Sequence, residues 1–326
     1  MATVSNRSEI LFIYHVKDAN PNGDPLDENK PRTDPDTGVA TVTDVRIKRT
    51  IRDYWHQNLG HEILVRDTFT DEGYLKDGKG RSRSFLEDAN KVFDNILEAE
   101  REIREAILTQ CIDARVFGCT LPVEVNVKKK RGKTEKAEKD KGSVTLTGPV
   151  QFSGFNRSLH QVAPVFVQGT AAFASSENAR QKSFREDYVL PYACIAVYGI
   201  VNEIAARTTQ MSDDDVEKVL EGLWRGTENL ISRSKMGHQP LLLMHLEYRD
   251  NFRIGDLSSR ISLKTNDGKQ GPQLRDPSDF HIDASPLAAA AKAAGDKILR
   301  QRCMRDDRLR VEGIDISACD TLSFGS

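Results

Sequence analysis

Acidic and basic side chains near the start of the chain have the types and spacing that metal or phosphate chemistry would use. Asp18, Asp24 and Asp27 lie in a segment rich in asparagine, proline and glycine. Four cations follow it at helical spacing: Arg46, Lys48, Arg49 and Arg52. Carboxylates on a loop can recruit magnesium for RNA cleavage, whereas cations can hold a phosphate backbone without cutting it. The residue types alone leave both readings open.

A calcium site is the weaker metal hypothesis. The run from Asp18 to Asp24 resembles the start of the calcium loop of helix-loop-helix proteins. The twelfth position, however, is Asn29 instead of a glutamate, and Pro21 interrupts the pattern. We therefore expect no metal ion and no cofactor.

The elements that must position these side chains follow from local pattern. Residues 9–16 are apolar, β-branched and aromatic, which predicts a strand, and residues 18–25 and 32–38 are rich in turn formers. A helix is expected to begin at Thr43 or Asp44. One arc of this helix is apolar, from Ile47 to Trp55, and the four cations occupy the rest.

Further candidates for binding a nucleic-acid strand are polar residues in turns. Asn20 and Asn22 can direct amides at a backbone. A second group precedes a predicted strand and offers two cations, a hydroxyl and a side chain that could slip between bases: Arg233, Ser234, Lys235 and Met236. The alternative for that segment is a helix C-cap that uses Gly237.

The sequence of residues 16–35, VKDANPNGDPLDENKPRTDP, and that of residues 42–49, VTDVRIKR, are long and unusual in composition. They closely resemble the repeated backbone subunit of type I CRISPR interference complexes, the Cas-seven family, in its type I-B-like or I-C-like branches. The resemblance is strongest over about the first sixty residues. It implies a non-catalytic protein whose partners are a CRISPR guide RNA, further copies of itself and other Cascade subunits. Target DNA would be reached through base pairing with the guide.

The resemblance also bears on the cleavage hypothesis. Related backbone subunits of type III complexes cut target RNA with an aspartate in a loop after the first strand, and Asp18 or Asp24 would take that role here. Type I members are not expected to cut RNA, and residues 16–35 and 42–49 resemble those of type I members. Metal-dependent cleavage therefore stays the alternative function.

The order of predicted elements is that of an α+β, ferredoxin-like (RRM-like) β-α-β-β-α-β core with two insertions. The later core elements are expected to be strands at residues 143–152, 188–201 and 239–248, and a helix that Ser212 caps and that extends to Ile231. We assign the core to residues 7–58, 143–154 and 188–250. The RNP1 signature of ordinary RNA-recognition motifs is absent from the sequence.

The resemblance also implies what the residues outside the core form. A helical, finger-like insertion would span residues 59–142, a thumb-like β-hairpin insertion residues 155–187, and a C-terminal extension residues 251–326. Within the thumb, Arg157 is a candidate RNA contact, and Phe155 and Phe166 are candidates for a wedge between nucleotides.

Local pattern gives further expectations for the two largest of these parts. In the finger, residues 63–65 predict a short strand, and Ser84 predicts a capping box that opens a long helix as far as Ile107. Residues 128–141 hold eight basic side chains, which indicates a mobile loop or an arm that contacts phosphates. After Tyr248 we expect irregular chain apart from a helix capped by Ser285.

Composition limits the classes of protein. The chain has 326 residues and a formal net charge of −2, so any nucleic-acid surface must be a local patch. The longest apolar run, residues 189–201, is too short to span a bilayer, and the N-terminus lacks a signal-peptide core. We therefore expect a cytoplasmic protein without a membrane partner. Five scattered cysteines without a C-x-x-C pair predict reduced thiols.

Overall fold

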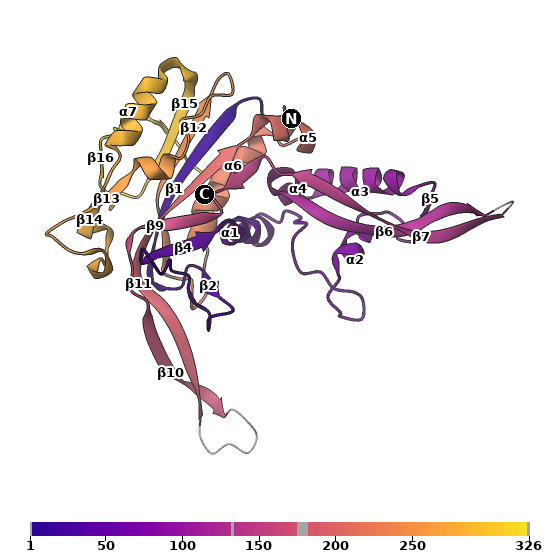
Figure 1. The fold of residues 1–326 in the computed structure, drawn as a ribbon, viewed down its shortest axis with the longest axis horizontal. Helices are drawn as coiled ribbons and strands as arrows, with labels where there is room; N and C mark the ends of the chain where they lie inside the picture. The colour runs from indigo at the N-terminus through magenta and orange to yellow at the C-terminus, as the bar shows by residue number, and fades with distance from the viewer. Residues whose placement is uncertain (1, 132–133, 175–181, 325–326) are drawn as a thin grey trace. The chain divides into compact units, whose positions relative to one another are not determined.

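The computed structural model describes residues 2–131, 134–174 and 182–324, except the side chains of residues 130–135 and 170–185. The described chain has a mixed α/β architecture with seven α-helices (Figure 1). It divides into two compact units. The first comprises Met1–Ser5, Arg52–Gln151 and Asn202–Lys218, and the second Asn6–Ile51, Phe152–Val201 and Val219–Ser326.

The second unit is built on a large sheet, whose order is β17-β15-β12-β1-β11-β9-β4. The central strand β1 (Arg7–Ala19) pairs antiparallel with β11 (Lys182–Val201) on one side and with β12 (His238–Tyr248) on the other. The outer strands are β9 (Phe155–Gln161), β4 (Val39–Thr43), β15 (Ile298–Arg305) and β17 (Asp320–Thr321). The expected strands at residues 9–16, 188–201 and 239–248 are confirmed.

The two faces of β1 carry different layers, because successive side chains of a strand point to opposite faces. Phe12 and Tyr14 lie on the face that carries the first half of α1 (Asp44–Gln57) and the second half of α6 (Asp213–Glu228). Leu11 and Ile13 pack on the other face against residues of the C-terminal segment, including Phe280 and Leu287. Both helices are confirmed, although α6 ends three residues before Ile231, which is exposed.

The C-terminal segment is more regular than the sequence pattern predicts. Strands β13 (Ser262–Thr265), β14 (Phe280–Asp283) and β16 (Val311–Glu312) form a small sheet, and β15 joins the main sheet beside β12. The expected helix is present as α7 (Ser285–Ala294), with Ala284 at its N-cap position. These strands are two to eight residues long, and their stabilising partners lie far away in the sequence.

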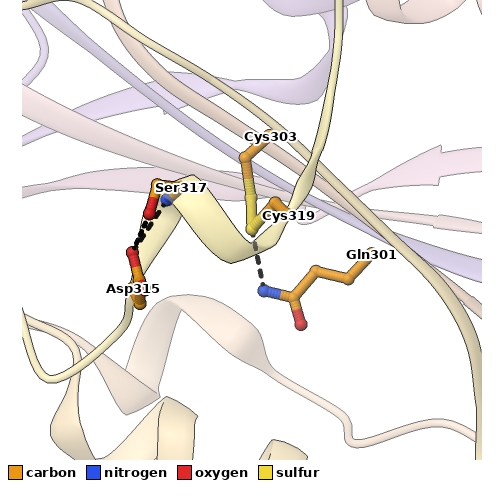
Figure 2. The surroundings of a disulfide bond; sticks show 5 residues. All are labelled: Gln301, Cys303, Asp315, Ser317 and Cys319. Atoms are coloured by element: carbon orange, nitrogen blue, oxygen red, sulfur yellow. Dashed lines mark hydrogen bonds between the residues drawn. A yellow bond between two sulfur atoms is a disulfide. The ribbon is translucent and has the colours of Figure 1, made fainter.

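Cys303 and Cys319 form a disulfide that joins β15 to the segment just before β17 (Figure 2). The prediction of reduced thiols is therefore wrong for this pair, because sequence spacing carried no sign that strand pairing would bring the two residues together. The other three cysteines are free thiols: Cys111, Cys119 and Cys194.

A long two-stranded ribbon dominates the first unit (Figure 1). It consists of β6 (Gly118–Arg131) and β7 (Thr134–Thr147), with α3 (Ile96–Gln110) packed along it. The predicted loop at residues 128–141 is thus wrong for the described part, because cross-strand pairing orders a segment that has few apolar side chains. The strand expected at residues 143–152 is instead divided between β7 and β8 (Val150–Phe152).

Helix predictions in this unit also need correction. Ser84 ends the short helix α2 (Gly78–Arg83) instead of opening a long one, and α3 begins after Asn95, whose side chain accepts a hydrogen bond from Glu98 N. Residues 63–65 form no strand, and Ile63 and Leu64 are buried in the loop. The remaining elements of the unit are α4 (Ile112–Phe117), β5 (Val92–Phe93) and α5 (Glu203–Thr209).

Two short strands and a hairpin complete the second unit. Strands β2 (Gly23–Asp24) and β3 (Lys30–Pro31) close the turn-rich loop after β1. Strand β10 (Val165–Ala174) pairs with the first part of β11 and forms the projecting hairpin that the sequence predicts (Figure 1). None of the helices among the described residues is long and apolar enough to cross a membrane.

Candidate nucleic-acid interface

The first half of α1 carries three of the predicted cations. Thr43 Oγ1 accepts a hydrogen bond from Arg46 N at 3.3 Å and so caps the first turn. Arg46 donates from Nη2 to Thr50 Oγ1 at 3.1 Å, and Lys48 pairs with Asp44 at 3.1 Å. Arg46, Lys48 and Arg49 are half-buried, and each already takes part in an interaction within the protein.

Arg52 does not belong to this group. Arg52 is 8% exposed, and its Nε lies 2.9 Å from Asp113 Oδ2. The guanidinium also lies over the ring of Phe117, and Asp113 accepts hydrogen bonds from Leu64 N and Val65 N. Arg52 thus stabilises the first unit and presents no charge to a ligand. Helical spacing predicted it as a surface cation because the apolar arc is wider than the sequence indicated.

The segment between α6 and β12 is bound to the end of β1. Lys17 N donates to Gly237 O at 2.9 Å, and Asn20 N donates to Ser234 O at 2.9 Å. A Cβ atom on Gly237 would lie 1.8 Å from Lys17 O, so this close approach requires glycine. The alternative of a helix C-cap at Gly237 is wrong, since α6 ends at Glu228.

Docking of this segment brings Lys235 next to Asn20 and Arg46. Lys235 Nζ donates a hydrogen bond to Asn20 O. Burial, together with the positive charge of Arg46, lowers the pKa of Lys235 to about 7. An anion bound here would stabilise the charged form of Lys235, because opposite charge favours ionisation.

A small and mainly apolar cavity lies beside Arg46 and the first half of α1. It is lined by Tyr14, Pro21, Arg46 and His238, and its volume of about 10 Å³ is close to that of one water molecule, too small for a nucleobase. His238 is 3% exposed, its Nδ1 lies 2.6 Å from Lys235 O, and its Nε2 has no partner among the described residues. Burial lowers the pKa of His238 to about 3, so its ring is neutral near pH 7. A ligand therefore stays on the surface above this cavity.

The asparagines and the neighbours of Lys235 occupy different environments. Asn20 and Asn22 are buried, and the side-chain amide of Asn20 donates to Asn29 O at 2.7 Å. Arg233 pairs with Asp187 at 2.7 Å, and Ser234 lines a cavity rich in carboxylates. Met236 is 70% exposed and so is free to contact a base. Lys235 lies near Arg46, and Met236 follows it in the chain, whereas Arg233 is neutralised by Asp187.

Arg157 lies on β9 and lines a separate cavity with Asp256 and Ser258. That cavity shares no lining residue with the one below Lys235. Phe155 and Phe166, the candidate wedges, are 57% and 47% exposed. They lie on β9 and β10 respectively, so the described part of the chain offers two apolar protrusions on different strands.

Two of the three candidate acidic side chains, Asp24 and Asp27, stabilise the turn between β2 and β3. Asp24 accepts a hydrogen bond from Leu26 N at 3.0 Å and pairs with Arg32 at 2.9 Å, and Asp27 pairs with Lys30 at 2.8 Å. Asp18 is exposed and has a positive φ of 50°. Across the described residues, no group of three or more His, Cys, Asp or Glu side chains is arranged to hold a metal ion.

Sequence reasoning missed Tyr14, His238 and the backbone role of Gly237. Tyr14 and His238 stack with ring centroids 5.9 Å apart, although they are separated by more than two hundred positions. Antiparallel pairing of β1 with β12 brings them together. A glycine directly before a predicted strand was the one local sign of a close backbone approach.

Comparisons with known proteins agree with this architecture. The family model described as CRISPR-associated protein Cas7 matches residues 6–285. A curated relative from Haloferax volcanii, "CRISPR-associated protein Cas7", is 32% identical over 318 residues, which is 95% of this chain and 90% of the relative.

Among solved structures, a chain of a "CRISPR RNA-guided surveillance complex, pre-nicking" has a similar fold. The TM-score is 0.54 at 13% identity, and the match covers 98% of this chain and 96% of that one. The family expected from residues 16–35 and 42–49 is confirmed. The chain therefore belongs to the Cas7 family of CRISPR-associated proteins.

Proposed function

We propose that this protein is a non-catalytic backbone subunit of a type I Cascade complex that binds CRISPR guide RNA. The observation that carries the proposal is the cluster of Lys235 and Arg46 at the end of β1, where burial and like charge lower the pKa of Lys235 to about 7. Two desolvated cations side by side favour an anionic ligand. A phosphate of an RNA strand supplies that charge, and Met236 offers an apolar contact for a base.

The proposed core is ferredoxin-like. In the sheet, β12, β1, β11 and β9 are neighbours in that order, and each adjacent pair is antiparallel. With α1 between β1 and β9 in the sequence, and α6 between β11 and β12, this order supports a split βαβ fold. The C-terminal extension would then span residues 251–326, the thumb expected at residues 155–187 would begin only after β9, which is a strand of this core, and the finger expected at residues 59–142 would extend to the end of β7 at Thr147. The ribbon of β6 and β7 and the hairpin of β10 and β11 support these assignments.

Affinity of one copy for RNA would be modest. Arg52 is buried and Lys48 pairs with Asp44, so about three phosphate contacts remain, from Arg46, Lys235 and Arg49. At a slope of roughly −0.7 per contact, affinity would fall about twentyfold between roughly 50 and 200 mM salt. Several copies on one guide would raise the effective concentration of each contact. In this proposal the copies hold the guide extended for pairing with target DNA, beside other Cascade subunits.

The absence of a catalytic role is part of the proposal. The side chain of Asp24 is engaged by Leu26 N and Arg32, so it is placed to hold the turn closed. We expect Asp18→Ala and Asp24→Ala proteins to retain guide-dependent DNA binding. Magnesium-dependent cutting of complementary RNA by the unaltered protein, lost in either variant, would instead establish the alternative of a type III kind.

Charge reversal tests the binding surface. We expect Arg46→Glu combined with Lys235→Glu to abolish RNA binding, measured by fluorescence anisotropy with a short single-stranded RNA. A matched control is Lys264→Glu combined with Lys292→Glu, which makes the same change in net charge at exposed residues that line neither the cavity below Lys235 nor the one beside Arg233. Equal loss in both proteins would show a non-specific effect of charge and would contradict the proposed surface.

A further inference from the structure

A second and larger cavity lies at the base of the β10–β11 hairpin. Its volume is about 370 Å³. It is lined by the end of β1, the β2–β3 loop, the two strands of the hairpin, and Arg233 with Ser234. All of these segments belong to the second unit, so the cavity is defined within one compact body.

The lining of this cavity is acidic. Asp18, Glu28, Glu186 and Asp187 contribute four carboxylates, and Arg233 contributes one cation. Arg233 pairs with Asp187 at 2.7 Å and Lys30 pairs with Glu28 at 3.4 Å, which leaves Asp18 and Glu186 as the lining carboxylates without an ion pair among the described residues. A phosphodiester strand is repelled by such a surface, whereas a positively charged group is attracted to it.

A buried amide adds an independent sign of a ligand. Asn20 is 3% exposed and lines the cavity. Its Nδ2 donates to Asn29 O at 2.7 Å, which fixes the orientation of the amide. Its Oδ1 has no hydrogen-bond partner among the described residues. An unsatisfied buried acceptor calls for an N–H or O–H donor.

Carboxylates together with a free amide acceptor fit an ammonium or guanidinium group, which has donors only. Part of the lining is apolar, because Val167 of β10 and Val189 of β11 contribute to it, and Val167 is 41% exposed. Long basic side chains match such a site, because their aliphatic stems pack on apolar surface while their charged ends reach acceptors.

We propose that this cavity is a socket for a lysine or arginine side chain of a second copy of this chain. The inference rests on the proposed function, in which several copies share one guide. It deepens that function by naming a contact between the copies. The complementary surface is the ribbon of β6 and β7, where exposed basic side chains gather in the described part: Lys129, Lys136, Lys139 and Lys141.

The register of the ribbon supports its role as the donor. Lys129 lies directly opposite Lys136, and like charges at opposite positions of a strand pair repel each other. Asp140 is 3.9 Å from Lys129 and offsets part of this repulsion. A cluster of carboxylates from a second copy would offset the rest. The ribbon and the socket are therefore complementary in charge.

A charge exchange tests the contact. One variant carries Glu28→Lys and Glu186→Lys, a second carries Lys136→Glu and Lys139→Glu, and a third combines all four changes. The control for the first variant is Asp296→Lys with Asp307→Lys, which makes the same change in charge at exposed residues outside the socket.

Two readouts separate the contact from RNA binding. Anisotropy with an RNA that holds one copy of the unaltered protein measures the RNA site, and native mass spectrometry with a long RNA counts the bound copies. We expect the first and second variants each to need at least tenfold more protein to fill the long RNA, without weaker binding to the short RNA. The combined variant should recover assembly to within threefold of the unaltered protein.

Several results would overturn the inference. These are normal assembly of the first or second variant, equal loss of assembly in the control, and no recovery in the combined variant. Weaker binding of the first variant to the short RNA would show that the cavity holds a nucleotide instead. If the unaltered protein binds neither RNA, the proposed function itself fails, which is a different outcome from a loss that appears with the long RNA alone.

Discussion

Under the proposed function, the lowered pKa of Lys235 should make the affinity for RNA depend on pH in a predictable direction. In the free protein, burial and the charge of Arg46 bring this pKa to about 7. A bound phosphate raises it again, because the negative charge favours the protonated amine. Affinity should therefore be constant below about pH 7 and should fall as the pH rises above it.

The size of the effect follows from the fraction of protonated lysine. With a free pKa of about 7 and a much higher pKa in the complex, the affinity at pH 8.5 is roughly twentyfold weaker than at pH 6.5. The neighbouring titratable group does not interfere, since the pKa of His238 is lowered to about 3 and its ring is neutral across this range. Arg46 stays charged throughout.

Anisotropy titrations at constant ionic strength, with one short RNA, measure this dependence. Lys235→Arg is the decisive comparison, because arginine keeps its charge to high pH. We expect this variant to bind with little dependence on pH, and Lys235→Met to bind weakly at every pH. Loss of folding cannot explain a weaker affinity at high pH. A lysine whose pKa is lowered by folding makes the native state more stable as the pH rises from about 7 towards its unfolded value.

A flat affinity profile for the unaltered protein would refute this reasoning. So would a Lys235→Arg profile that falls as steeply as that of the unaltered protein, because the titrating group would then lie elsewhere.

Three further predictions concern stability. Arg52→Ala should lower the free energy of unfolding by about 3–5 kcal/mol in urea titrations, because Asp113 is left buried without its cation, and RNA affinity should change little in the folded fraction. Gly237→Ala should cost about 1–3 kcal/mol and also weaken RNA binding, since its Cβ would displace the segment that carries Lys235. Unchanged affinity would contradict that placement. Cys303→Ser should cost about 3 kcal/mol in non-reducing urea titrations, as expected for a cross-link between residues 16 positions apart, and nothing under reducing conditions.

Elements with a strong local signal could be predicted from the sequence. The apolar run of β1, the cap at the start of α1 and the acidic first turn of α6 each carry their own information, and the structure confirms all three elements. The ribbon of β6 and β7 could not be predicted, because its distal half is charged and its order depends on cross-strand pairs. The same limit applies to β15 and to the disulfide of Cys303, whose partners are set by the tertiary fold.

The candidate site was predictable only where it depends on local sequence and not on tertiary contacts. Arg46 and Lys235 were found because cations near turns are visible in the sequence. Their closeness was not visible, since the docking of Gly237 on Lys17 depends on the pairing of β1 with β12. Arg52 and Arg233 were predicted as RNA contacts, but Asp113 binds Arg52 and Asp187 binds Arg233. Helical periodicity and local composition cannot reveal these two partners, because the tertiary fold brings them close.

Photo-cross-linking of guide RNA to the assembled protein, followed by mass spectrometry of the cross-linked peptides, tests the central claim most directly. We predict cross-links on the segment that contains Lys235 and Met236 and on the first half of α1 around Arg46. Cross-links confined to β9 around Arg157 or to the ribbon of β6 and β7, with none at Lys235, Met236 or Arg46, would contradict the account.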